Sequence, residues 1–173
     1  LNNLGMSYAN IYKYKKAEEF YKKGLKIDKN NSQILNNLAN LKKDLDKTEE
    51  AVHLYNKILS RQPNAMATIY NLANLYNTMG EFEKSKKLFF EILKIRSDFT
   101  EADRSISQMT KYDNKNPHFI KMKKKLSDTK LTDRSLLHLH FALGKAYDDQ
   151  KKYDKCFENY KKANDISKKF NKY

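Results

Sequence analysis

Asparagine side chains recur through the N-terminal half of this sequence at a fixed spacing. Asn3, Asn37 and Asn71 stand 34 residues apart. An asparagine amide carries both a hydrogen-bond donor and an acceptor, so it can bind the main chain of an extended peptide at two points, whatever the peptide's side chains. The candidate peptide-binding residues are Asn2, Asn3, Asn36, Asn37, Asn40, Asn71 and Asn74.

These asparagines are concentrated in the segments that we expect to form the first helix of each repeating unit. Residues 1–11, 32–45 and 66–79 hold nine asparagines, whereas the expected second helices, residues 12–25, 46–59 and 80–93, hold only Asn56. A general compositional bias would enrich asparagine everywhere, and asparagine is a poor helix former. The asymmetry therefore favours a binding surface. The alternative is a set of solvated polar positions.

Other reactive residue types do not form a comparable constellation. His138 and His140 are two residues apart, so they point in different directions on a helix, and His140 occupies a bulky packing position. Cys156 stands where other units have a small residue, and we interpret it as a small buried side chain. Adjacent carboxylates are interpreted as surface charges: Glu49, Glu50, Asp148 and Asp149. We predict no catalytic residue, no metal ligand and no cofactor.

The segments that carry the asparagines repeat with the same period. Three sets recur at it: Leu4, Leu38 and Leu72; Ala17, Ala51 and Ser85; and Tyr21, Tyr55 and Phe89. Such a period is typical of a solenoid of stacked units, none of which can bury its apolar face alone. The apolar spacing predicts two helices in each unit, with turns at residues 12–14 and 79–80. Gly80 suits the left-handed conformation that ends a helix.

These residues resemble the tetratricopeptide repeat, in which small residues let paired helices approach closely and aromatic residues fill the space between repeats. The pattern recurs in Leu143, Gly144, Tyr147, Cys156, Tyr160 and Ala163. The resemblance implies an all-α fold, a right-handed α–α solenoid of helix hairpins, with protein or peptide partners. We expect three repeats in residues 1–99, the first truncated, a degenerate repeat or connector in residues 100–136, and a further repeat in residues 137–173.

The expected connector departs from the repeat pattern. The sequence predicts a helix at residues 100–110, a turn-rich break at residues 113–117, a short basic helix at residues 119–126 and a loop at residues 127–129. Thr132 and Asp133 are candidate N-cap residues for a long helix that starts near Arg134.

Two further resemblances bear on function. Asn3, Asn37 and Asn71 resemble the asparagine ladder of protein O-GlcNAc transferases, which holds extended polypeptide; the ladder stops early, because Ser105 and Ala142 occupy the later equivalent positions. From about Ser105 onward the chain is similar to the connector that leads into the catalytic domain of bacterial tetratricopeptide-repeat sulfotransferases. This similarity implies a sulfotransferase as the parent protein.

No catalytic residue can be carried over from the sulfotransferases. Their catalytic domain needs a Gly/Ser/Thr-rich phosphate loop at a helix N-terminus, which this sequence lacks. Leu1 is not a start methionine and falls inside a repeat, so we expect the sequence to be a segment of a longer protein.

The net charge of +14 raises the question of nucleic-acid binding. Only four of the 35 basic residues are arginine, the residue suited to bidentate phosphate contacts, and much of the lysine alternates with acidic residues. No apolar run reaches the ~20 residues of a membrane span. We therefore expect a cytoplasmic module that binds extended polypeptide in the concave groove of the solenoid. The alternatives are a stand-alone scaffold without an enzymatic domain and a basic nucleic-acid-binding solenoid.

Overall fold

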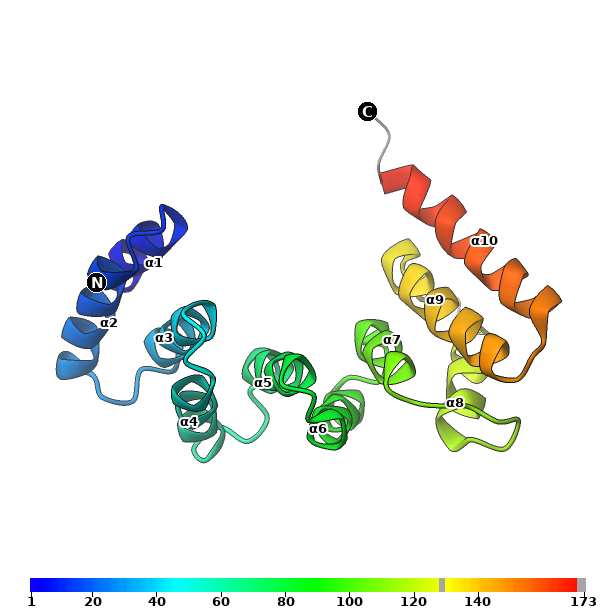
Figure 1. Ribbon diagram of the computed structural model, residues 1–173, viewed down its shortest axis with the longest axis horizontal. Helices are drawn as coiled ribbons and strands as arrows, with labels where there is room; N and C mark the ends of the chain where they lie inside the picture. The colour runs from blue at the N-terminus through cyan, green and yellow to red at the C-terminus, as the bar shows by residue number, and fades with distance from the viewer. Residues whose placement is uncertain (128–129, 171–173) are drawn as a thin grey trace. The chain divides into compact units, whose positions relative to one another are not determined.

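The computed structural model describes residues 1–127 and 130–170, and within these residues every regular element is an α-helix (Figure 1). The all-α fold class predicted from the sequence is confirmed. The helices are α1 (Asn2–Asn10), α2 (Tyr14–Ile27), α3 (Ser32–Asp44), α4 (Thr48–Leu59), α5 (Met66–Thr78), α6 (Phe82–Ile95), α7 (Thr100–Gln108), α8 (Pro117–Lys125), α9 (Asp133–Asp149) and α10 (Tyr153–Phe170). Residues 128–129, in the predicted loop, and residues 171–173, at the end of the predicted last repeat, lie outside the described residues.

The chain divides into two compact units, Leu1–Ser85 and Lys86–Tyr173, with the boundary inside α6. In the first unit α1 packs on α2 and α3 packs on α4, and α3 also contacts α1 and α5. In the second unit α7, α8 and α10 all contact α9. In the first unit, α1–α2 and α3–α4 are therefore hairpins whose first helices touch, and in the second unit α9 and α10 form a further hairpin. The predicted repeat boundaries, at 1–99, 100–136 and 137–173, remain predictions.

Close contact between paired helices depends on residues without a bulky side chain. Ala17, Ala51 and Ser85, the small residues that recur in the sequence, are all fully buried. Gly5 of α1 faces Tyr21 of α2 so closely that a Cβ atom would lie 2.4 Å from the tyrosine Cε1. A separation that short is far inside van der Waals contact, so only glycine fits there without movement of the ring.

The turns inside the hairpins share one backbone geometry. In the described residues a positive φ occurs at Tyr12, Asp46, Gly80 and Lys151. The residue that follows donates its N–H to the carbonyl five residues back, as in Lys13 to Tyr8 and Lys152 to Tyr147, each at 2.9 Å. This is the Schellman motif that ends helices. The left-handed conformation predicted for Gly80 is confirmed, at φ 76°.

The expected connector contains α7, α8 and the start of α9, and side chains cap the N-termini of α8 and α9. α7 ends at Gln108, two residues before the predicted end. α8 begins at Pro117, two residues before the predicted start, because the Asn116 side chain accepts hydrogen bonds from the N–H groups of the next two non-proline residues at 3.0 and 3.3 Å. Proline at the first helical position suits this start. The predicted cap at Thr132 is confirmed, since its hydroxyl accepts from the Ser135 N–H at 3.1 Å.

Candidate functional site

The seven predicted asparagines all lie on the first helices of the first unit, α1, α3 and α5. Asn3 is exposed, and the other six are half-buried. Because these three helices contact one another in order, the asparagines of neighbouring helices come within reach of each other.

Two amide–amide hydrogen bonds connect these helices. Asn37 Nδ2 donates to Asn2 Oδ1 at 2.8 Å, and Asn71 Nδ2 donates to Asn36 Oδ1 at 3.3 Å. In both bonds the two residues are 35 apart in the sequence, one more than the repeat length of 34. Each asparagine therefore bonds not to the equivalent residue of the earlier repeat but to the residue just before it. Asn3 is not brought together with Asn37 in this way. The amides of Asn37 and Asn71 each have a second N–H and a carbonyl oxygen beyond the bond that they donate.

Asn40 has a structural partner that the sequence did not reveal. Its Oδ1 accepts a hydrogen bond from the Tyr55 hydroxyl at 2.5 Å, and the tyrosine is fully buried. Burial, with a smaller contribution from the charge of Asp44, raises the pKa of Tyr55 well above its usual range. Asn40 therefore supplies a hydrogen-bond partner for a buried hydroxyl that would otherwise be unsatisfied. Asn74 contributes its backbone carbonyl to the Thr78 hydroxyl at 3.1 Å.

Lys42 of α3 is a lysine that does not lie in solvent. Its side chain is buried, and Nζ lies 3.0 Å from Glu18 Oε1 and 2.6 Å from Glu50 Oε2. Burial alone would lower the pKa of Lys42, but hydrogen bonds to the two carboxylates outweigh it and raise the pKa. Glu50 is exposed as predicted, yet it is a partner of this lysine. Glu18, Lys42 and Glu50 thus form ion pairs that connect α2, α3 and α4.

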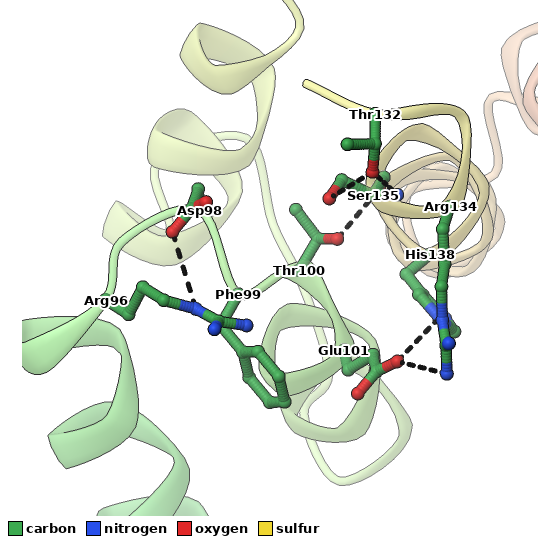
Figure 2. Close-up of a pocket in the computed structure, with 9 residues that line it drawn as sticks. All are labelled: Arg96, Asp98, Phe99, Thr100, Glu101, Thr132, Arg134, Ser135 and His138. Atoms are coloured by element: carbon green, nitrogen blue, oxygen red, sulfur yellow. Dashed lines mark hydrogen bonds and ion pairs between the residues drawn. The ribbon is translucent and has the colours of Figure 1, made fainter. Parts of the chain in front are cut away.

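In the second unit, a pocket of about 440 Å³ lies beside the N-terminal ends of α7 and α9 (Figure 2). Arg134 Nη2 lies 3.0 Å from Glu101 Oε1, and His138 Nε2 lies 3.3 Å from the same oxygen without hydrogen-bond geometry. Burial lowers the pKa of His138, Glu101 opposes this effect, and two arginines reinforce it. The net effect is a lowered pKa, which favours the neutral form of the His138 imidazole.

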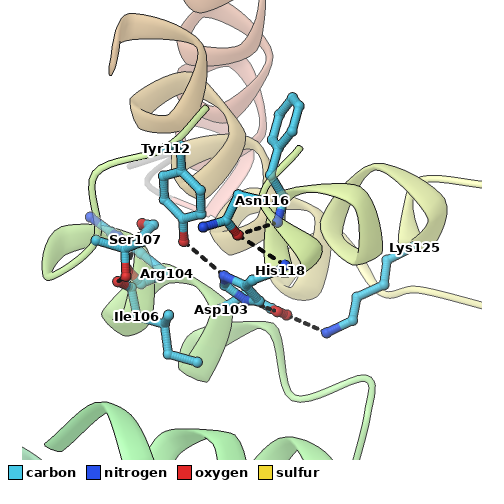
Figure 3. A network of polar contacts seen from close by, with 10 residues as sticks. Asp103, Arg104, Ile106, Ser107, Tyr112, Asn116, His118 and Lys125 are labelled. Carbon is cyan, nitrogen blue, oxygen red and sulfur yellow. Dashed lines mark hydrogen bonds and ion pairs between the residues drawn. The ribbon is translucent and has the colours of Figure 1, made fainter. Parts of the chain in front are cut away.

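A network of buried polar groups connects α7 and α8 (Figure 3). Asp103 is fully buried, and its two oxygens lie 2.9 Å from His118 Nε2 and 2.5 Å from Lys125 Nζ. The Tyr112 hydroxyl lies 2.7 Å from His118 Nδ1. If Tyr112 donates to Nδ1 and Nε2–H donates to Asp103, each group has its partner. No sequence pattern indicates this network, because its members are common residue types that are scattered along the chain.

Beside this network lie the three residue types of a catalytic triad, but they are not arranged to act as one. Ser97, His118 and Asp103 line one pocket of about 700 Å³. A triad needs a histidine nitrogen free to take the serine proton. Here Nδ1 is bonded to Tyr112 and Nε2 to Asp103, so neither nitrogen can act as a base toward Ser97. The arrangement stabilises the fold.

Other side chains singled out in the sequence have structural partners. His140 is buried, as its packing role predicts, with Nδ1 2.9 Å from Asn159 Oδ1. Cys156 is buried, and burial raises the pKa of its thiol, which suits an unreactive small side chain. Asp149 was interpreted as a surface charge, and this is wrong: its Oδ2 accepts from the Tyr112 N–H at 2.9 Å and from Lys145 at 2.6 Å.

The described residues contain neither a candidate metal site nor a candidate membrane span. No group of three or more His, Cys, Asp or Glu residues there could hold a metal ion. No helix among them is both long enough and apolar enough to span a bilayer.

Comparison with known proteins identifies the class of the chain. Family models described as tetratricopeptide repeats match residues 1–31, 20–53, 67–99 and 137–170, which together make up more than half of the sequence. The chain belongs to the tetratricopeptide-repeat family. It is a protein–protein interaction module, and its partners are proteins or peptides. No curated protein matches the sequence.

Solved structures share the fold at low sequence identity. The protein MamA is 20% identical with a TM-score of 0.72, and the match covers 98% of each chain. A putative kinesin light chain from Podospora anserina with nearly identical TPR-like repeats is 14% identical with a TM-score of 0.73, over 99% of this chain and 95% of the other. YrrB, described as a TPR protein with an unusual peptide-binding site, is 15% identical with a TM-score of 0.66, over 95% of this chain and 84% of its own.

Proposed function

We propose that the first unit binds an extended polypeptide through the asparagines of α1, α3 and α5. The observation that carries this proposal is the pair of amide–amide bonds, Asn37 to Asn2 and Asn71 to Asn36. These bonds orient two amides at the repeat spacing along one set of helices. Each amide retains a donor and an acceptor for the main chain of a ligand.

The chemistry of the amide favours the peptide main chain as the ligand. An extended chain presents N–H and C=O groups at regular intervals, and an asparagine can pair with both. Half-buried amides that are already held by a neighbour lose little side-chain entropy on binding. The peptide-binding site named for YrrB is an analogy from a protein of the same fold.

The test compares asparagines of the first helices with one of the second. A peptide selected on an array of immobilised random sequences is labelled, and its affinity is measured by fluorescence anisotropy. We expect Asn37→Ala and Asn71→Ala each to weaken binding about three- to tenfold, the contribution of one hydrogen bond. Asn56→Ala, on the exposed side of α4, is the matched control.

Two changes in the peptide sharpen the test. Methylation of its main-chain nitrogens should abolish binding, whereas changes of its side chains should have small effects. If Asn37→Ala and Asn71→Ala bind as the unsubstituted protein does while remaining folded, the asparagines are structural only and the proposal is wrong.

The sulfotransferase parent remains a second proposal, supported only by the resemblance from about Ser105 onward. The three structural relatives named above are not described as sulfotransferases. Reading the coding sequence beyond Tyr173 tests it. A strand followed by a Gly/Ser/Thr-rich loop and a helix would support an attached catalytic domain. Further repeats or a stop codon would leave a scaffold, and a cytoplasmic location is likewise still a prediction.

A further inference from the structure

The second unit contains a pocket that the asparagine surface does not use. It has a volume of about 700 Å³, within the usual range for ligand-binding pockets. α6, α7 and α8 supply its lining, which includes Phe90, Leu93, Asp103, His118, Lys121 and Lys124. All of these residues belong to the second unit, so the pocket is contained in one compact body.

One wall of the pocket is apolar and partly open to solvent. Phe90 is 39% exposed although it is a large hydrophobic residue. Its ring meets the His118 ring edge-on, with centroids 5.3 Å apart and an interplanar angle of 84°. His118 is fixed in turn by Asp103 and Tyr112, so this wall is rigidly held. An apolar ligand group placed against Phe90 would remove its exposed face from water, which is favourable.

The other wall is strongly basic. Lys121, Lys124 and Lys125 of α8 and Lys94 of α6 line it. Lys125 is paired with Asp103 and Lys94 with Glu91. Lys121 and Lys124 have no ion pair with any carboxylate in residues 1–127 and 130–170. Two ammonium groups beside an apolar wall are complementary to a ligand that combines negative charge with an apolar group.

We propose that this pocket binds an acidic peptide segment of a partner protein, in which one aromatic or aliphatic side chain is flanked by Asp or Glu. The apolar side chain lies against Phe90 and Leu93. The flanking carboxylates lie beside Lys121 and Lys124. A protein ligand agrees with the family of the chain, and a peptide supplies both chemistries within a few residues.

A nucleic acid fits the same pocket less well. Its phosphates match the lysines, but the lining contains no arginine for bidentate contacts. The exposed aromatic ring is already engaged edge-on with His118, which limits base stacking on it. A nucleic-acid ligand is therefore an outcome to be tested, not the proposal.

The test uses the full chain and two labelled probes. The first is a fluorescein-labelled Asp-Glu-Phe-Glu-Asp peptide, and the second replaces its phenylalanine with serine. We expect the serine probe to bind about tenfold more weakly, because it cannot bury an apolar group against Phe90. The double variant Lys121→Gln/Lys124→Gln should weaken binding of the first probe about fivefold.

A matched control separates the pocket from general charge. Lys111→Gln/Lys161→Gln removes the same charge from exposed positions of the second unit that do not line the pocket. It should leave binding unchanged. If both double variants weaken binding equally, or if the two probes bind equally, the pocket is not the site and the proposal is overturned.

Two other outcomes would also overturn it. A single-stranded polyuridine probe that binds more tightly than the peptide, with the same dependence on Lys121 and Lys124, would assign the pocket to nucleic acid. Loss of peptide binding in Asn37→Ala, but not in Lys121→Gln/Lys124→Gln, would place the probe on the asparagine surface. In that case this inference fails while the proposed function stands.

Discussion

His118 Nε2 of α8 lies 2.9 Å from the Oδ1 of the fully buried Asp103 of α7. This contact connects α7 and α8. The imidazole also contacts Tyr112 through Nδ1 and Phe90 of α6 through its ring. A buried carboxylate requires such partners, since an unpaired charge in a protein interior is costly. This contact therefore supplies Asp103 with one of the partners that its burial requires.

Removal of this imidazole should destabilise the second unit. We expect His118→Ala to lower the free energy of unfolding by about 3 kcal/mol, because the buried Asp103 loses one hydrogen-bond partner and keeps only Lys125. Urea denaturation followed by circular dichroism measures the loss. His53→Ala, at an exposed position of α4, is the control and should change stability by less than about 0.5 kcal/mol. Equal midpoints for the two variants would contradict the role of His118.

Stability should depend on pH through His138. Burial lowers the pKa of this group in the folded chain relative to 6.5, so the unfolded chain binds more protons as the pH falls. Its contribution to stability is therefore fully present above pH 6.5 and is lost as the pH falls toward the folded pKa. The thermal midpoint should decrease between pH 7.5 and pH 5.5, roughly one unit either side of the unperturbed histidine pKa.

A variant isolates the contribution of His138 from those of other groups. His138→Gln, which cannot titrate, should show a smaller decrease in the midpoint over the same interval. An identical pH dependence in the variant would show that burial does not perturb this histidine.

Removal of the hydrogen bond between Asn40 and Tyr55 should reduce stability by different amounts, depending on which of the two residues is substituted. Asn40→Ala leaves the fully buried Tyr55 hydroxyl without its partner, which costs about 1–3 kcal/mol. Tyr55→Phe removes the buried hydroxyl itself and should cost about 1 kcal/mol. Chemical denaturation of both variants checks the order. A greater loss for Tyr55→Phe would mean that the hydroxyl does not depend on Asn40.

Glycine should stabilise a turn that holds a side chain in the left-handed region. Lys151 has φ 58°, at the place in its hairpin where Gly80 stands in another. Glycine adopts this left-handed conformation without strain, so Lys151→Gly should raise the free energy of unfolding by about 1 kcal/mol. The greater entropy of the unfolded chain with glycine reduces this gain. Thermal unfolding measures the gain. Lys161→Gly, inside α10, is the opposite control, since glycine in a helix costs about 1 kcal/mol. A loss at Lys151 comparable to that at Lys161 would refute this account.

The sequence by itself determined the fold class and most of the helix hairpins. The 34-residue recurrence of residues such as Ala17 and Ala51 fixes where helices pack, because only small side chains allow that approach. Turn and cap chemistry is equally local. Gly80 and Thr132 act through the backbone of their own neighbours, so their roles could be read without a structure.

Tertiary structure alone decided which polar groups meet. Asp103 and His118 are 15 residues apart and Asn37 and Asn2 are 35 apart, and no local pattern relates them. The burial of Lys42 and the partners of the half-buried Asp149 were likewise missed, because a charge looks the same in sequence whether solvated or paired. The periodicity of the sequence indicates on which face of its own helix a side chain lies. Which polar partner a side chain meets, and how far it is buried, depends on the neighbouring helices. These contacts form only when the helices pack together.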